Sequence, residues 1–284
     1  MRLLHAGAHA IDVSTPRVMG IVNVTADSFF DGGRLDAQAA IGHALQLAAD
    51  GAAIVDVGGE STRPGATPVA ESVELQRVIP IVDALAREGV CVSVDTMKPA
   101  VMRAALDAGA AMINDVRALQ APGALDVAAA GDAAVCLMHM QGEPRTMQQA
   151  PAYRDVVAEV RGFLARRAQA CLDAGIAAER IVVDPGLGFG KTLAHNLDLL
   201  RHLGEFAALG FPVLVGLSRK STIGALTGRE LDDRLAGSVA AAIVAASRGA
   251  RLLRVHDVRA TVDALAVWQA IEQPASAPGR ASDQ

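Results

Sequence analysis

Eight short, nearly uninterrupted apolar runs alternate along the chain with alanine-rich segments, and this alternation constrains the fold more than any other feature of the sequence. Apolar runs without polar alternation are typical of parallel strands that are buried on both faces. The sequence therefore predicts a parallel sheet with strands at Val18–Val22, Ala53–Val57, Val90–Val94, Met112–Asn114, Ala134–Met138, Ile181–Asp184, Pro212–Gly216 and Leu252–Val255.

The segments between these runs are rich in Ala, Leu, Arg and Glu, which favour the helix intrinsically. They predict helices over Ala37–Asp50, Glu71–Arg87, Pro99–Ala108, Tyr153–Asp173, Leu193–Leu203, Asp232–Ser247 and Val258–Ile271. Dividing the 284 residues by eight gives roughly 35 residues per strand–helix unit, close to what an eightfold barrel requires. The predicted fold class is α/β, a single-domain (β/α)8 TIM barrel. An open, doubly wound sheet is the structural alternative, because alternation alone does not prove closure.

The domain organisation follows from the same pattern. We expect an N-terminal segment over residues 1–16 and the barrel over residues 17–272. Residues 273–284 contain no large apolar side chain, so a disordered tail is expected there. Acidic residues outnumber basic ones by 31 to 26, which argues against nucleic acid or an anionic membrane surface as a partner.

The cysteines and the first residues bear on cellular location. Cys91, Cys136 and Cys171 lie far apart without the spacing of a metal site, so buried and reduced thiols are expected. His5 and His9 interrupt the first apolar stretch, which therefore lacks the core of a signal peptide. No apolar run approaches the length of a membrane span. A cytoplasmic protein is the expectation.

Polar residues follow every predicted strand, and in a barrel these strand ends meet at one rim, where catalysis takes place. A single such residue can simply cap the next helix, but a polar residue at all eight ends favours an active-site mouth. The residues are Asn23, Asp56, Asp95, Asn114–Asp115, His139, Asp184, Ser218–Lys220 and His256–Asp257.

Three of these strand ends carry cations and predict a substrate with a phosphate or a carboxylate. They are Ser61–Gly65, Ser218–Ser221 and Arg254–His256, although a helix-capping ion pair explains any single one about as well. The segment Pro185–Thr192 ends like a phosphate-binding loop, but Pro185 stands where that motif needs glycine, so we reject a nucleotide motif. No transition-metal site is visible in the sequence.

Taken in order, these segments resemble the dihydropteroate synthases of the pterin-binding barrel family. The resemblance covers residues 17 to about 270, and its most specific parts are the first two segments and the S-R-K-S motif. The one departure is Ala26, where the family usually has proline in N-V-T-P-D-S-F. The matching segments are Asn23–Gly33, Asp56–Gly65, Val94–Thr96, Ile113–Asp115, Leu137–Gly142, Asp184–Lys191, Gly216–Ser221 and Arg254–Asp257.

The resemblance implies condensation of 6-hydroxymethyl-7,8-dihydropterin pyrophosphate with 4-aminobenzoate, with Mg²⁺ as cofactor, in folate biosynthesis. It implies pterin binding by Asp95, Asn114, Met138, Asp184 and Lys220, and pyrophosphate binding by Asn23, Thr62, Arg63, Arg254 and His256. Asn23 would also ligate the metal. The aminobenzoate site would comprise Thr62, Arg63, Phe189, Arg219 and Ser221, and the catalytic group Asp95, Asp184, Lys220, Arg254 and His256.

The resemblance also suggests a homodimer, with the small apolar residues of Asp232–Ser247 as a candidate interface, and mobile lids over residues 25–34 and 61–69. Three other functions stay open at this point. They are a Schiff-base lyase with Lys220 as nucleophile, a pterin-dependent methyltransferase domain, and a catalytically silent paralogue that binds pterin.

Overall fold

The computed structural model describes residues 2–25, 30–31, 34–62 and 65–272. Eight parallel strands close into a barrel, each pairing with the next in chain order, and the last pairs with the first. Closure confirms the TIM barrel and excludes the open sheet, and all eight predicted strands are present. The barrel strands are β3 (Arg17–Asn23), β6 (Ile54–Gly58), β7 (Val92–Asp95), β8 (Met112–Asp115), β9 (Ala134–Met138), β10 (Ile181–Asp184), β11 (Val213–Val215) and β12 (Ala250–Val255).

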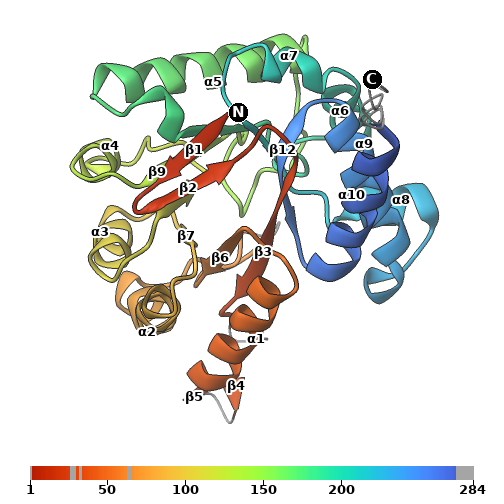
Figure 1. Cartoon of the computed structure of the whole chain (residues 1–284). Coiled ribbons are helices and arrows are strands. Elements are labelled where there is room, and N and C mark those ends of the chain that lie inside the picture. Colours follow the sequence, from red (N-terminus) through yellow and green to blue (C-terminus); the bar gives the residue numbers. More distant parts are fainter. Residues whose placement is uncertain (1, 26–29, 32–33, 63–64, 273–284) are drawn as a thin grey trace, which may run out of the picture.

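Helices surround the barrel in a ring (Figure 1). They are α1 (Ala37–Ala49), α2 (Glu71–Arg87), α3 (Pro99–Asp107), α4 (Ala124–Ala129), α5 (Val156–Asp173), α6 (Leu193–Arg201), α7 (Leu203–Ala207), α8 (Ser221–Thr227), α9 (Leu235–Ser247) and α10 (Val258–Glu272). Short 3-10 turns lie at Ala178–Arg180 and Leu231–Asp233, and a two-residue pair, β4 (Phe30–Asp31) with β5 (Arg34–Leu35), precedes α1.

The helix boundaries differ from the predicted ones where capping decides them. The helix expected from Tyr153 begins at Val156, because the Asp155 carboxylate accepts a hydrogen bond from the Ala158 amide. The helix expected over Leu193–Leu203 divides at His202 into α6 and α7. The short helix α4 was not among the expected elements, since six residues are too few to establish a helical period.

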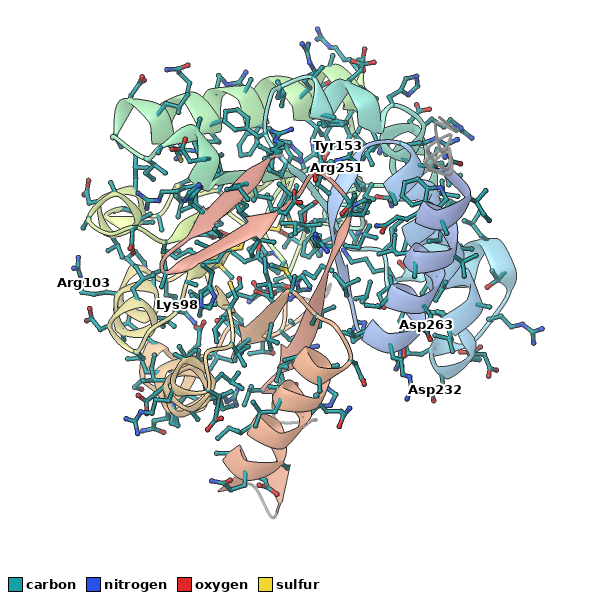
Figure 2. The ribbon with its side chains drawn as sticks, viewed as in Figure 1. Lys98, Arg103, Tyr153, Asp232, Arg251 and Asp263 are labelled. Carbon is teal, nitrogen blue, oxygen red and sulfur yellow. The ribbon has the colours of Figure 1, made fainter. Side chains whose placement is uncertain are left out.

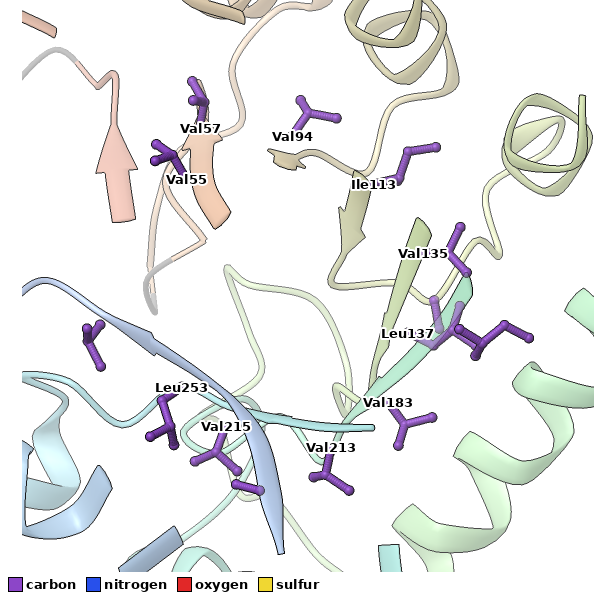
Figure 3. Close-up of a cluster of buried hydrophobic side chains, with 14 of the residues drawn as sticks. Val55, Val57, Val94, Ile113, Val135, Leu137, Val183, Val213, Val215 and Leu253 are labelled. Carbon is purple, nitrogen blue, oxygen red and sulfur yellow. The ribbon is translucent and has the colours of Figure 1, made fainter. Parts of the chain in front are cut away.

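Two apolar clusters fill the structure, one on each side of the barrel wall. The outer cluster packs alternate strand residues, among them Val55, Val57 and Leu253, against the helices (Figure 3). The inner cluster fills the N-terminal end of the barrel with the remaining alternate residues, including Met19, Ile54 and Met112. Side chains of a strand point alternately to its two faces, so the runs are apolar on both sides in this half of the barrel.

A hairpin of β1 (Leu3–Ala6) and β2 (His9–Asp12) lies across the N-terminal end of the barrel (Figure 1). Leu4, Ala6 and Val13 are fully buried in the inner cluster. The sequence predicts only an N-terminal segment over residues 1–16, and the hairpin itself is not among the expected elements. Its apolar side chains seal the end of the barrel opposite to the polar strand ends.

The cysteines are free and buried, as expected, and Cys91 and Cys136 belong to the inner cluster. Among the residues that the structure describes, none of the helices is both long enough and apolar enough to span a bilayer. The tail predicted over residues 273–284 lies outside the described residues.

If the hairpin seals the barrel, shortening Leu4 will destabilise the fold. Leu4→Ala leaves a cavity in a fully buried site and is expected to lower the free energy of unfolding by about 2–5 kcal/mol. Urea denaturation followed by circular dichroism measures the change. Val73→Ala, an exposed position on α2, is the control and should change stability by less than about 0.5 kcal/mol. Equal effects of the two substitutions would contradict the sealing role.

Candidate active site

The C-terminal half of the barrel interior is polar, in contrast to the apolar end under the hairpin. Residues two positions apart on a strand face the same side, so Asp56 faces the barrel interior like Ile54, and Asn114 does so like Met112. Asp95 on β7 and Asp184 on β10 face the interior as well. All four side chains are almost completely buried. A buried carboxylate is costly unless it is paired and hydrogen-bonded, so the partners of these groups define the site.

Arg254 on β12 is the partner of two of these carboxylates. Its Nε donates to Asp56 Oδ2 at 2.6 Å, and its Nη2 donates to Asp95 Oδ2 at 2.7 Å. Asn114 Nδ2 donates to the same Asp56 oxygen at 3.1 Å. The side chain of Arg254 is 19% exposed and that of Asp56 is fully buried, so this charge cluster is largely shielded from water. One guanidinium thus joins β12 to β6 and β7, two strands that are not its hydrogen-bonded neighbours in the barrel.

The electrostatics of the cluster follow from burial and from this pairing. Burial acts to lower the pKa of Arg254, but Asp56 and Asp95 outweigh it, so the pKa lies above its ordinary value and the guanidinium stays charged. Burial raises the pKa of Asp95, with Arg254 acting in the opposite direction. Burial likewise raises the pKa of Asp184, against the opposing effect of Lys220. Each carboxylate thus depends on a neighbouring cation for its charge.

Lys220 lies in the loop after β11, beside the same group of buried polar residues. Its Nζ donates to the Leu187 carbonyl at 2.5 Å and lies 4.5 Å from the centre of the Phe189 ring. Burial lowers the pKa of Lys220 to about 8, although Asp184 acts to raise it. Asp184 Oδ1 accepts the Gly186 amide at 2.7 Å, which fixes its carboxylate beneath the loop.

Five further predicted residues that the structure describes lie at the same strand ends or in the loops and helix that follow them. His256 Nδ1 lies 3.0 Å from the Ser218 hydroxyl, and Asn23 ends β3. Met138 is buried at the end of β9. Arg219 makes a bidentate ion pair with Asp257, at 3.0 and 2.5 Å. Ser221 is the first residue of α8.

The two predicted lids, over residues 25–34 and 61–69, are only partly described by the structure. Ala26 in the first lid and Arg63 in the second lie outside the described residues. Thr62 is described and half-buried, just before that gap. Lys98, which is labelled in Figure 2, connects the chain on either side of residues 63–64. Its ammonium group donates to Glu60 before this gap and to the Val69 carbonyl after it, and it also pairs with Glu74.

Of the polar residues expected at the eight strand ends, Asp115 and His139 do not face the barrel interior, and Asp257 is bound to another predicted site residue. Asp115 accepts the amides of Arg117 and Leu119, both at 2.8 Å, and so holds its own turn. His139 contacts the Phe163 ring on α5, on the helix side of β9. Asp257 is occupied by Arg219. The alternation of side chains along a strand predicts this difference. Met138 and Asn114 face the barrel interior, so the residues that directly follow them, His139 and Asp115, face outward.

Asp56 is the functional residue whose importance the sequence analysis missed. It appeared only as one of the strand-end residues and received no role. In the structure it is the shared acceptor of Arg254 and Asn114, and its second carboxylate oxygen has no hydrogen-bond partner among the described residues. Its position inside an apolar strand was the available signal, because an ionised residue in such a run needs a partner.

The side chains available as ligands can be compared with what the expected Mg²⁺ requires. Within the described part of the chain, no group of three or more His, Cys, Asp or Glu side chains is arranged to hold a metal ion. Mg²⁺ is commonly bound through one or two protein ligands together with substrate phosphates, rather than by an all-protein cage. Asn23 at the end of β3, as a single oxygen ligand, fits a magnesium ion that arrives with a phosphorylated substrate.

Comparison with known proteins places the chain in a family. The family model described as "Pterin binding enzyme" matches residues 19–256. Dihydropteroate synthase of Escherichia coli K12 is 52% identical over 269 residues, covering 94% of this chain and 95% of that protein.

Solved structures that resemble the chain are also dihydropteroate synthases. The Xanthomonas albilineans dihydropteroate synthase with 4-aminobenzoic acid is 56% identical with a TM-score of 0.90, covering 96% of this chain and 99% of that one. The Burkholderia cenocepacia enzyme complexed with 7,8-dihydropteroate is 49% identical with a TM-score of 0.87, covering 95% and 96%.

The chain belongs to the pterin-binding enzymes, a family whose polar site lies inside a (β/α)8 barrel. Within that family it belongs to the dihydropteroate synthases, which are transferases.

If Arg254 is the shared hydrogen-bonded cation of two buried carboxylates, its removal will leave both without that partner. Arg254→Met is expected to lower the free energy of unfolding at pH 7 by about 3–5 kcal/mol, and adding Asp56→Asn should restore part of that loss. Urea denaturation of the wild type, both single variants and the double variant measures this coupling.

Arg251 provides the matched control for that experiment. It lies on the same strand, and its Nη1 donates to the neighbouring Ala250 carbonyl at 3.2 Å. Arg251→Met is expected to cost less than about 1 kcal/mol. Strictly additive effects of Arg254→Met and Asp56→Asn would rule out the coupling.

Proposed function

We propose that the polar end of this barrel transfers the pterin methylene group of 6-hydroxymethyl-7,8-dihydropterin pyrophosphate to the amine of 4-aminobenzoate, forming 7,8-dihydropteroate and pyrophosphate. The observation that carries the proposal is the buried Asp56–Arg254–Asp95 cluster, with Asn114, Asp184 and Lys220 beside it. It offers acceptors, donors and a cation within one group of side chains that is shielded from water. The relatives crystallised with 4-aminobenzoic acid and with 7,8-dihydropteroate support the same substrates.

The pterin half of the substrate fits the centre of the barrel. Asp95, Asn114 and Asp184 present carboxylate and amide groups to the amino-substituted ring, and Lys220 supplies a donor. Such complementary pairing suits a flat heterocycle with donors and acceptors on its edge. Met138, buried at the end of β9, packs against the face of the ring.

The pyrophosphate half fits the rim beside Arg254 and His256. The guanidinium has five N–H donors, and its bonds to Asp56 and Asp95 engage only two of them. Asn23, Thr62 and Arg63 are the further pyrophosphate residues of the proposal, with Arg63 outside the described residues. Asn23 would hold Mg²⁺, which would neutralise charge on the phosphate oxygens when bound.

The aminobenzoate half fits the outer rim around Phe189. The Phe189 ring is half-buried and packs against Lys220. Arg219, Ser221, Thr62 and Arg63 complete this subsite. Arg219 is held by Asp257 in the structure, so its guanidinium is fixed in place before the ligand arrives.

The reaction breaks the C–O bond between the pterin methylene and pyrophosphate, and the bonding electrons leave with the pyrophosphate oxygen. Arg254 and His256 stabilise the negative charge that develops there. Asp95 and Asp184 stabilise the positive charge that develops on the pterin. The arylamine nitrogen then bonds to the methylene carbon and loses a proton. A neutral arylamine is already nucleophilic, so the site does not need a strong base.

Pyrophosphate release is the direct test. Release from dihydropterin pyrophosphate and Mg²⁺ should depend on 4-aminobenzoate and be matched by dihydropteroate formation. Asp184→Asn should weaken pterin binding, and Arg254→Ala should weaken pyrophosphate binding. Tight pterin binding without turnover would instead support the silent paralogue, and trapping of a carbonyl substrate on Lys220 by borohydride would support the lyase.

The ionisation of Lys220 predicts an alkaline limit on activity. Because its pKa is lowered to about 8, the ammonium loses its charge above that pH, and kcat/KM should fall there. Lys220→Arg keeps its charge to much higher pH, so it should lack this alkaline limb even if its maximal rate is lower. A limb near pH 8 that persists in Lys220→Arg would assign the titration to another group.

We further propose a homodimer in the cytoplasm. Leu235 and Val244 on α9, and Val267 and Ile271 on α10, are exposed apolar side chains on neighbouring helices, which a second copy would cover. Three free buried thiols suit a reducing compartment. Light scattering at micromolar concentration should give twice the mass of one chain, and a monomer would refute the dimer.

A further inference from the structure

The loop after β10 is held by an unusual set of donors. Five consecutive carbonyls, from Gly186 to Gly190, each accept a hydrogen bond. The donors are the Phe189 amide for Gly186 (3.1 Å), Lys220 Nζ for Leu187 (2.5 Å), Gln148 Nε2 for Gly188 (2.8 Å), Lys191 Nζ for Phe189 (3.0 Å) and the Tyr153 hydroxyl for Gly190 (2.8 Å). Four of the five donors are side chains, so the loop conformation is set by its surroundings.

Two glycines bring this loop against the segment that follows β9. Gly186 and Gly190 both have positive φ angles, of 68° and 62°. A Cβ atom at Gly186 would lie 1.8 Å from the His139 carbonyl oxygen, and one at Gly190 would lie 2.5 Å from that of Gln141. Only glycine permits this close approach of two backbones.

Lys191 joins the two segments at this contact. It is 3% exposed, and its Nζ lies 3.0 Å from His139 Nδ1 and 3.3 Å from the His139 carbonyl, in addition to its bond to Phe189. These three acceptors match the three N–H donors of an ammonium group. Burial lowers the pKa of Lys191 to about 7, with Asp184 opposing that shift and Lys220 adding to it. A buried cation without a hydrogen-bonded carboxylate is costly, which indicates a role other than stability.

We propose that Lys191 is a positioning residue that fixes the Phe189 ring for the arylamine substrate, by clamping the Phe189 carbonyl to the segment after β9. This inference rests on the proposed function, in which Phe189 borders 4-aminobenzoate. Tyr153, which is labelled in Figure 2, assists from the next carbonyl. The centre of its ring lies 5.0 Å from that of His195, near the start of α6. The Leu187 carbonyl of the same loop contacts Lys220, so the clamp also defines the edge of the cavity.

Replacing Lys191 by Met tests the clamp, because Met fills similar space and donates no hydrogen bond. The KM for 4-aminobenzoate is expected to rise roughly tenfold, corresponding to the loss of one charge-assisted hydrogen bond. The Kd for dihydropterin pyrophosphate, measured by calorimetry without arylamine, should change less than about twofold. Tyr153→Phe keeps the ring and removes only the hydroxyl, so it should raise the same KM by a smaller factor.

Arg180→Met is the matched control. Arg180 is a half-buried cation that also holds backbone carbonyls, those of Ala128 and Ala133, but it does so before β10 at the opposite end of the barrel. The Arg180→Met variant should have the wild-type KM for 4-aminobenzoate, even if its melting temperature is lower than that of the wild type.

The outcomes separate this inference from the proposed function. If the wild type shows no arylamine-dependent release, the proposed function fails and the inference with it. If the wild type is active, an unchanged arylamine KM in both Lys191→Met and Tyr153→Phe would overturn the inference alone. An equal loss of affinity for both substrates, or the same KM change in Arg180→Met, would also overturn it, because a general weakening of the fold would then explain the result.

Discussion

The ion pairs of Arg254 with Asp56 and Asp95 are the constraint on which the rest of the barrel depends. Burying two carboxylates is unfavourable unless each has a charged hydrogen-bond partner, and the guanidinium donates one short bond to each of them. Asn114 adds a donor to the same oxygen of Asp56. Because these groups come from different strands, the cluster forms only when the barrel is closed. The charges that make catalysis possible therefore also require the complete fold.

The two ends of the barrel divide stability and function between them. The N-terminal end is filled by apolar side chains and sealed by the β1–β2 hairpin, where Leu4 is fully buried. That packing compensates for the polar groups at the other end, which contribute less to stability than a well-packed apolar core would. The C-terminal end is thus free to hold substrate-binding residues on strand ends and loops, as in other barrels of this class.

Much of this architecture is predictable from the sequence, because doubly buried parallel strands and alanine-rich helices have strong patterns. All eight strands lie where the apolar runs predict them, and the polar strand ends place Asp95, Asp184 and Arg254 in one cavity. The face on which a strand-end residue lies was harder to predict. His139 and Asp115 face away from the cavity, and the roles of Asp56 and Lys191 depend on partners far away in sequence. No local pattern encodes such pairings, so they require the folded structure.

The most direct test of the account is the turnover number of Asp56→Asn, which keeps the shape of the side chain but removes the charge that orients Arg254. Arylamine-dependent pyrophosphate release should fall by at least about tenfold in kcat. The KM for 4-aminobenzoate should change little, because Asp56 lies inside the barrel and away from Phe189 at the rim. Turnover equal to that of the wild type would contradict the claim that the buried ion cluster organises the active site.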